Sequence, residues 1–163
     1  MALRVRPRQT GDIGWACMRQ AELYAKEFRY LPVFEDYVIR SFAPFVERFD
    51  PAKDGLWVAE LGGRRVGCIA IQHDPVRPGW AQLRWYFVEA DARGHGVGRA
   101  LLDHAVAFCH KARFEGVWLW TVDDLVAARR QYESIGFRLR HTEPEPCVWA
   151  PWGREQRWEL KLR

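Results

Sequence analysis

Arg93-Gly94-His95-Gly96-Val97-Gly98-Arg99 joins a strand-like apolar run, Leu83 to Val88, to an amphipathic segment that begins at about Val97. Glycines let backbone N–H groups approach a ligand closely, and the first turn of a helix adds unpaired N–H donors and the positive end of the helix dipole. The stretch therefore predicts a cradle for a polyphosphate.

Two better-known phosphate cradles do not fit this spacing. The dinucleotide fingerprint G-x-G-x-x-G would need a third glycine at position 99, where the chain has Arg99. A phosphate loop of the G-x-x-x-x-G-K-[ST] kind needs a Gly-Lys pair, and the chain has none. What remains is R-G-x-G-x-G, with one arginine before the glycines and a second after them.

This pattern resembles the acetyl-coenzyme A pyrophosphate loop of the GNAT superfamily of N-acetyltransferases, [R/Q]-x-x-G-x-[G/A], with Arg93, Gly96 and Gly98 in order. Two flanking segments strengthen the resemblance. Residues 87–92 stand where the family has an apolar pair followed by an acidic residue, and residues 127–137 are similar to the family's A-x-x-x-Y-x-x-x-G-F segment. The resemblance covers about residues 56–140.

The resemblance implies a cosubstrate, acetyl-CoA, and assigns roles by position. In the family the coenzyme is held by the backbone of the loop and by the end of the preceding strand, where strands four and five splay apart. Tyr132 occupies the position of the tyrosine that protonates the departing thiolate; a core tyrosine is the alternative. The coenzyme contacts implied here are Phe87, Val88, Arg93, Gly94, His95, Gly96, Val97, Gly98 and Arg99.

Acetyl transfer to an amine also needs a group that takes a proton from the amine. An alkyl ammonium with a pKa near 10.4 costs about 4.6 kcal/mol to deprotonate at neutral pH. Glu27, Glu60 and Glu89 are candidates, and the sequence does not choose among them. Glu89 abuts the splayed strand and is the catalytic candidate; the alternative is a solvated carboxylate at a strand end.

Leu23 to Phe28 and Leu83-Arg84 resemble the acetyltransferase half of bacterial proteins that fuse a MarR-type regulator to a GNAT domain. By that resemblance Tyr24, Glu27 and Arg84 line the acceptor site. Strand alternation puts Arg84 on the face opposite Leu83, Trp85 and Phe87, where its guanidinium either clamps a substrate carboxylate or forms a surface ion pair.

Nine tryptophans are many for a chain of 163 residues. Trp149 and Trp152 lie in a proline-rich tail loop. They suit an aromatic-walled pocket, an ordinary core or a dimer interface equally well.

The periodicity predicts the element order β-α-α-β-β-β-α-β-α-β-β. This is an α/β fold, with a central mixed sheet of about seven strands flanked by about four helices in one GNAT acetyltransferase domain, residues 1–163. Asp12, and Asp123 or Asp124, are expected helix caps, and Gly136 a helix stop. The expected strands are Leu3–Arg6, Leu56–Leu61, Val66–His73, Trp80–Val88, Val117–Val122, Phe137–Arg140 and Arg157–Leu162, and the expected helices are Gly11–Tyr30, Val33–Phe49, Val97–Ala112 and Asp124–Ile135.

Composition narrows the class of partner. The net charge of +4 is carried mostly by arginine, which suits phosphate and carboxylate binding. Basic residues are interspersed with acids and no helix-turn-helix pattern occurs, so we expect no nucleic-acid partner. No apolar run approaches the roughly 18 residues of a membrane helix, and the N-terminus lacks a signal-peptide core, so a cytoplasmic protein without a membrane partner is expected.

The cysteines and histidines carry no metal or redox pattern. No C-x-x-C pair occurs, and the five histidines show neither i,i+4 pairing nor a carboxylate at ligand spacing, so no metal is expected. Cys68 and Cys109 lie in apolar runs and are expected to be reduced core thiols.

The predicted function is acetyl-CoA-dependent N-acetylation of a primary amine on a small molecule. An amino acid or a similar metabolite is one such molecule. Two alternatives stay open: acetylation of a protein, and a non-catalytic acyl-CoA sensor. The sensor is considered because residues 122–125 lack the asparagine that the family often has at the start of the next helix. The sequence leaves open the acceptor, the length of the acyl group, and whether the chain forms a homodimer.

Overall fold

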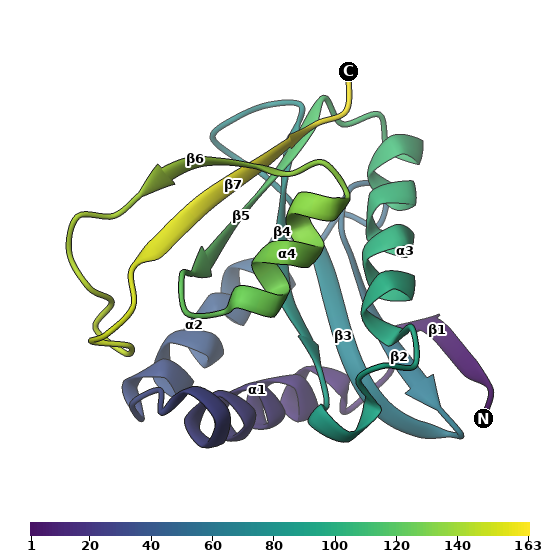
Figure 1. The fold of residues 1–163 in the computed structure, drawn as a ribbon. Coiled ribbons are helices and arrows are strands. Elements are labelled where there is room, and N and C mark those ends of the chain that lie inside the picture. The colour runs from purple at the N-terminus through teal and green to yellow at the C-terminus, as the bar shows by residue number, and fades with distance from the viewer.

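The computed structural model describes all residues, 1–163, and contains one seven-stranded sheet with the strand order β1-β2-β3-β4-β5-β7-β6 (Figure 1). The predicted order of elements is confirmed, including two helices between the first two strands. The strands are β1 (Leu3–Pro7), β2 (Gly55–Leu61), β3 (Arg64–His73), β4 (Trp80–Val88), β5 (Gly116–Val122), β6 (Arg138–Thr142) and β7 (Glu155–Lys161), and the helices are α1 (Asp12–Phe28), α2 (Val33–Glu47), α3 (Val97–Lys111) and α4 (Val126–Ser134), with a 3₁₀ turn at Ala90–Ala92.

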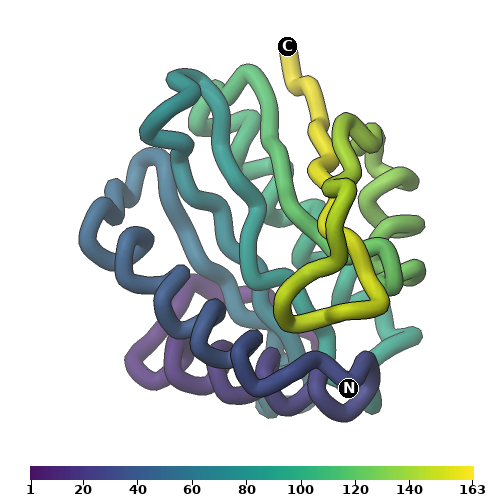
Figure 2. Tube along the Cα trace, turned by 90° about the vertical axis from the view of Figure 1, so that its left-hand side faces the viewer, coloured from purple at the N-terminus to yellow at the C-terminus, as the bar shows by residue number.

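The helices form two layers, one on each face of the sheet (Figures 1 and 2). Amphipathic helices bury their apolar stripes against the sheet, so each layer has its own core. On one face α3 and α4 pack on side chains such as Ile69, Leu83 and Leu119. On the other face α1 and α2 pack on Val58 and Trp85. None of the four helices is both long and apolar enough to cross a bilayer.

The parallel pair β4 and β5 is joined over only part of its length. Three residue pairs are in register, from Trp80↔Gly116 to Gln82↔Trp118, and beyond them the strands separate. Both strands continue, to Val88 and Val122, without pairing to each other. The splay leaves the facing edges of β4 and β5 without main-chain pairing in the middle of the sheet.

A bulge in β4 changes which face each side chain occupies. Between Cys68↔Phe87 and Ala70↔Arg84 the register shifts, and Trp85 adopts a left-handed φ of 51°. Leu83 consequently belongs to the α3–α4 core, whereas Trp85 and Phe87 belong to the α1–α2 core. The expectation that Leu83, Trp85 and Phe87 share a face is therefore wrong, because a bulge inserts a residue and resets the alternation.

Two of the expected helix caps are wrong as well. Helix α1 begins at Asp12 itself, whose carboxylate accepts hydrogen bonds from Arg6 at 2.8 Å and from the Gln9 amide at 2.6 Å. Helix α4 begins at Val126, and the Asp124 carboxylate accepts a hydrogen bond from the Tyr30 hydroxyl at 2.9 Å. In both places the carboxylate is bound by residues outside the helix, upstream neighbours at Asp12 and a residue 94 positions away at Asp124, and not by the helix end.

Two other expectations are confirmed. Gly136 follows α4 with a left-handed φ of 105°, as a helix stop requires. Cys68 and Cys109 are fully buried free thiols.

Candidate functional site

The loop before α3 presents six consecutive backbone N–H groups that donate to no atom of the protein. These amides belong to residues 94–99, where the next intrahelical bond starts at Ala100, whose amide donates to the Gly96 carbonyl at 3.0 Å. Gly94 and Gly96 have left-handed φ values of 81° and 78°, which glycine adopts without strain. Unpaired amides at the start of a 15-residue helix form an anion-binding site.

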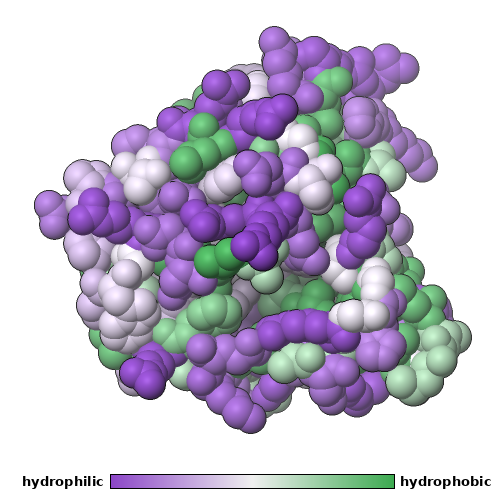
Figure 3. Space-filling view, viewed as in Figure 1, coloured by the Kyte–Doolittle hydropathy of each residue, from purple (hydrophilic) through white to green (hydrophobic).

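Five of these six residues, all except His95, line a cavity of about 430 Å³ between the loop, α1 and α4, here called the loop cavity. Figure 3 shows a recess at this place, between α4 and α1, with apolar residues on its floor. The small side chains of Ala127 and Ala128 let α4 approach. A Cβ at Gly98 would collide with the Tyr86 hydroxyl. The cavity is lined by Leu23, Tyr24, Phe28, Tyr86, Phe87, Val88, Arg93, Gly94, Gly96, Val97, Gly98, Arg99, Leu125, Ala127, Ala128 and Gln131.

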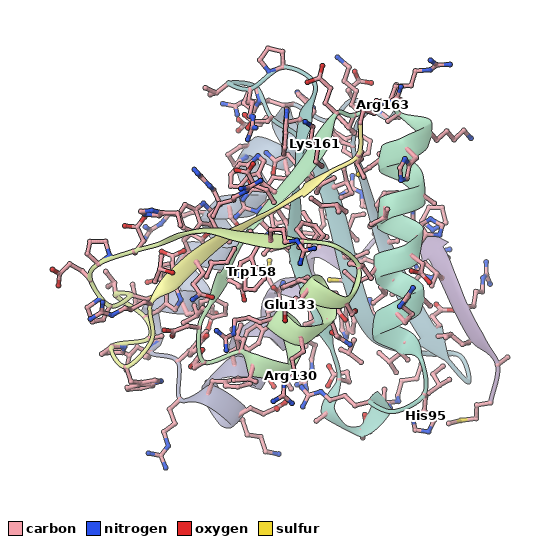
Figure 4. The ribbon with its side chains drawn as sticks, turned by 45° about the horizontal axis from the view of Figure 1, so that its top comes forward. His95, Arg130, Glu133, Trp158, Lys161 and Arg163 are labelled. Atoms are coloured by element: carbon pink, nitrogen blue, oxygen red, sulfur yellow. The ribbon has the colours of Figure 1, made fainter.

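Eight of the nine residues expected to contact the coenzyme line this cavity; His95 does not. Its Nδ1 lies 3.1 Å from the Arg93 carbonyl oxygen and 3.2 Å from that of Ala92, so the ring packs back on its own loop. Figure 4 shows His95 at the outer edge of the loop, on the side away from α4. Its amide is one of the six free donors, so only the backbone of His95 is available to a ligand.

The guanidinium of Arg93 is occupied by the protein itself. It forms a two-point ion pair with Glu27 of α1, with N–O distances of 2.7 and 2.8 Å, and donates to the Val88 carbonyl at 3.3 Å. The pair ties the loop to α1. Glu27, expected at the acceptor site, lines neither the loop cavity nor the aromatic cavity described below.

The three glutamates considered as proton acceptors are all paired with arginines. Glu27 is bound by Arg93, Glu60 by Arg6 at 2.7 Å, and Glu89 by Arg19 at 2.6 and 2.9 Å. Glu89 is buried, so the solvated alternative is wrong, and it lines neither the loop cavity nor the aromatic cavity described below. The charge-assisted hydrogen bonds from these arginines occupy the carboxylate oxygens that would otherwise accept a proton from an amine.

A second cavity, of about 120 Å³, lies on the α1–α2 side of the splayed strands and is here called the aromatic cavity. It meets the loop cavity at Tyr24, Tyr86 and Leu125, which line both. Trp149 of the tail loop closes one side, with its backbone oxygen accepting from the Leu31 amide at 2.8 Å, whereas Trp152 is exposed. The lining residues are Gln20, Tyr24, Tyr30, Phe34, Tyr37, Val38, Gln82, Leu83, Arg84, Trp85, Tyr86, Trp120, Thr121, Val122, Leu125, Tyr132, Trp149 and Glu155.

Tyr132 reaches the aromatic cavity from α4, on the opposite layer of the molecule, and its hydroxyl makes no hydrogen bond within the protein. Burial raises the pKa of Tyr132 well above its ordinary value, so the phenol stays protonated at neutral pH. Burial likewise raises the pKa values of Tyr24, Tyr30 and Tyr86; these four are called the high-pKa tyrosines below. The Tyr24 hydroxyl donates to the Tyr86 carbonyl at 3.2 Å.

Arg84 lines the aromatic cavity, and the surface ion pair considered for it does not form. No carboxylate lies within 4.0 Å of its guanidinium, which contacts the Tyr37 hydroxyl at 3.4 Å and lies over the Trp85 ring at 4.9 Å. Arg84 does face away from Leu83, as alternation predicts, but the bulge brings Trp85 to its own side of the strand.

Glu155, at the start of β7, is a functional candidate that sequence reasoning missed. It lines the aromatic cavity, is half-buried, and has no cation within 4.0 Å. Burial raises its pKa, and the nearby Glu143 raises it further. No sequence motif marks it; only the pairing of Glu155 with Val122, beside the splay, brings it to the site.

The comparisons with known proteins agree with this geometry. The sequence profile of the Acetyltransferase (GNAT) family matches residues 18–137. An uncharacterised N-acetyltransferase of Schizosaccharomyces pombe is 32% identical over 122 residues, which are 74% of this chain and 72% of the yeast protein. The N-acetylaspartate synthetase of Danio rerio is 34% identical over 88 residues, 54% of this chain but only 31% of that longer protein.

The solved structures show the same fold. A GNAT-family acetyltransferase from Staphylococcus aureus superimposes with a TM-score of 0.78 at 16% identity, covering 99% of this chain and 100% of that one. A GCN5-related N-acetyltransferase from Kribbella flavida gives a TM-score of 0.76 at 21% identity, covering 99% and 98%. The profile match spans more than half of the chain, so the chain belongs to the GNAT family of acetyltransferases and is an enzyme that transfers an acyl group to an amine.

Proposed function

We propose that this enzyme transfers the acetyl group of acetyl-CoA to a primary amine of a small molecule, and that residues 1–163 act as one acetyltransferase domain. The observation that carries the proposal is the run of six unpaired amides, 94–99, beside a cavity that shares the lining residues Tyr24, Tyr86 and Leu125 with a second, aromatic cavity. A diphosphate offers the acceptor oxygens that these amides lack. Acetyl-CoA, when bound, supplies a thioester from which an amine can take an acetyl group.

The chain's residues fit each part of such a coenzyme. The loop amides and the positive end of α3 would hold the diphosphate. Arg93, already paired with Glu27, keeps the loop in place rather than binding phosphate directly. Phe87 and Val88 pair with β3 but have no partner on the β5 side; they border the loop cavity, and their backbone would hold the pantetheine arm and the thioester carbonyl. A donor preorganised in this way contributes about 3 kcal/mol to transition-state stabilisation.

Two cavity residues would handle the protons. Glu155 would accept a proton from the attacking amine, because it is the unpaired carboxylate in the aromatic cavity and its raised pKa makes it a better base. It shares the cavity with Arg84, Tyr30, Tyr37 and Tyr132. Tyr132 would donate its proton to the departing thiolate, since its phenol has no other partner and stays protonated.

The size of the aromatic cavity supports a small acceptor over a protein. Its volume of about 120 Å³ lies below the range of roughly 300–1,000 Å³ that is usual for ligand pockets. Tyr37, Trp149 and the α1–α2 connection close its sides, and they leave little room for a polypeptide backbone.

Calorimetry with CoA and acetyl-CoA tests the proposal, followed by thiol release from acetyl-CoA with a panel of amines. Both coenzymes should bind, and acetylpantetheine, which has no diphosphate, should bind at least about 100-fold more weakly, because it loses several charge-assisted hydrogen bonds. Binding without thiol release would favour a sensor. Equal affinity for acetylpantetheine would show that the loop amides do not hold a diphosphate.

A further inference from the structure

The guanidinium of Arg84 is a half-buried positive charge without a counter-charge. By contrast Arg6, the arginine that is fully buried, is paired with Asp12 at 2.8 Å and Glu60 at 2.7 Å. No carboxylate lies within 4.0 Å of Arg84, and the surrounding aromatic rings lower its pKa by desolvation. A charge held in this way is stabilised when an anion binds beside it.

Two further donors belong to Tyr37 and Trp149, whose side chains line the aromatic cavity together with Arg84. The Tyr37 hydroxyl is 3.4 Å from an Arg84 nitrogen, and the Tyr37 ring stacks on Trp149 with centroids 4.4 Å apart. The indole nitrogen of Trp149 is buried and donates to no atom of the protein. The guanidinium, the phenol and the unpaired indole N–H can all donate hydrogen bonds. Together they complement a ligand group with several acceptor oxygens, such as a carboxylate.

The same cavity contains one unpaired negative charge. Glu155 has no cation within 4.0 Å and is not paired with Arg84. One free cation and one free anion in a cavity of about 120 Å³ complement a small molecule that carries both charges. A plain alkyl amine would leave Arg84 unpaired, and a protein lysine brings no carboxylate to it.

We propose that the acceptor is a small free amino acid, whose carboxylate is bound by Arg84 together with Tyr37 and Trp149 while its amine faces Glu155. The inference rests on the proposed function, because it names the substrate class of that reaction. It makes Arg84 the residue that determines specificity for a carboxylate beside the amine.

The experiment measures thiol release from acetyl-CoA with the standard amino acids, and then with the α-carboxamide and the decarboxylated amine of each amino acid that reacts. We expect kcat/KM for the acid to exceed that for its carboxamide about 10- to 100-fold, as for loss of a hydrogen-bonded charge. Thermal-shift titration with the same amino acids, without acetyl-CoA, gives a second readout that needs no turnover.

Variants assign the effect to Arg84. In Arg84→Gln the preference for the acid should fall to within about twofold, and stabilisation by amino acids should disappear, while affinity for acetyl-CoA is retained. Arg84→Lys keeps the charge without the planar fork and should recover part of the preference. Arg140→Gln on exposed β6 is the matched control and should behave as wild type.

The outcomes separate the two proposals. An acid preference that Arg84→Gln abolishes supports the inference. Thiol release with amines or peptides but without a preference for the acid overturns the inference and leaves the proposed function intact. The same conclusion follows if the protein binds acetyl-CoA but shows no thermal shift with any amino acid. Failure to bind CoA at all would overturn the proposed function instead.

Discussion

Replacing Tyr132 by Phe should lower kcat about 100-fold while leaving the fold and the affinity for acetyl-CoA unchanged. The hydroxyl has no hydrogen-bond partner in the protein, whereas the ring packs against Tyr86 and Phe137 at centroid distances of 5.9 and 5.8 Å. The substitution keeps these ring contacts and removes only the oxygen. The free energy of unfolding should therefore change by less than about 1 kcal/mol.

The magnitude follows from the chemistry of the cavity. General acid catalysis contributes typically about 10²–10⁴-fold, and a 100-fold loss corresponds to about 2.7 kcal/mol of transition-state stabilisation. Burial raises the pKa of Tyr132, and the same desolvation would raise the pKa of a thiol formed beside it. The two groups therefore keep similar proton affinities, and a proton can pass from the phenol to the thiolate.

Steady-state kinetics with thiol detection, together with calorimetry for acetyl-CoA, checks the prediction. Tyr24→Phe is the matched control, because its hydroxyl lies at the same junction of cavities but already donates to the Tyr86 carbonyl at 3.2 Å. That variant should lose only a few-fold in kcat. If Tyr132→Phe stays within twofold of wild type, Tyr132 is not the acid; a matched fall in coenzyme affinity would instead assign it to binding.

Three further predictions concern the loop, the base and the tyrosines. Gly96→Ala should destabilise the protein by about 1–2 kcal/mol because φ is +78°, whereas Gly14→Ala in α1, where a Cβ meets nothing within 4 Å, should stabilise it by about 0.5–1 kcal/mol; denaturant unfolding that gives both changes the same sign would contradict this. In the wild type, kcat/KM should fall as the pH falls through the raised pKa of Glu155. Glu155→Gln should be about 100-fold slower, and its kcat/KM should not show this fall at low pH; a variant whose pH profile still shows the fall rules Glu155 out as the base. The high-pKa tyrosines lose protons more readily in the unfolded chain, so their contribution to stability is complete below about pH 10 and is lost as the pH rises further. Tyrosinate absorbance that rises reversibly near pH 10 in the folded protein would refute this.

Local sequence signals were sufficient to predict the glycine loop and the helix that follows it. The glycines at 94 and 96 adopt the left-handed backbone that the loop pattern implies, and α3 begins at Val97 as the apolar spacing predicts. These features depend on backbone sterics and on periodicity within one segment, which adjacent residues determine.

The partners of the charged residues were beyond local reasoning. Glu89 binds Arg19 and Glu27 binds Arg93 across sequence separations of 70 and 66 residues. A carboxylate beside a splayed strand and one buried against an arginine look alike in a sequence, because only packing decides which distant cation lies within reach. For the same reason Asp12 binds Arg65, 53 residues away, and Asp124 binds Tyr30, 94 residues away, instead of capping helices.

The sequence by itself determined the order of strands and helices, the conformation of the glycine loop and the family of the enzyme, since each is written in contiguous residues. Tertiary structure alone decided that a bulge at Trp85 resets the faces of β4, that Arg84 lies without a counter-charge among aromatic rings, and that Glu155 from the last strand joins it. The register of the sheet sets these positions. It depends on contacts along whole paired strands, so no single segment of the chain determines it.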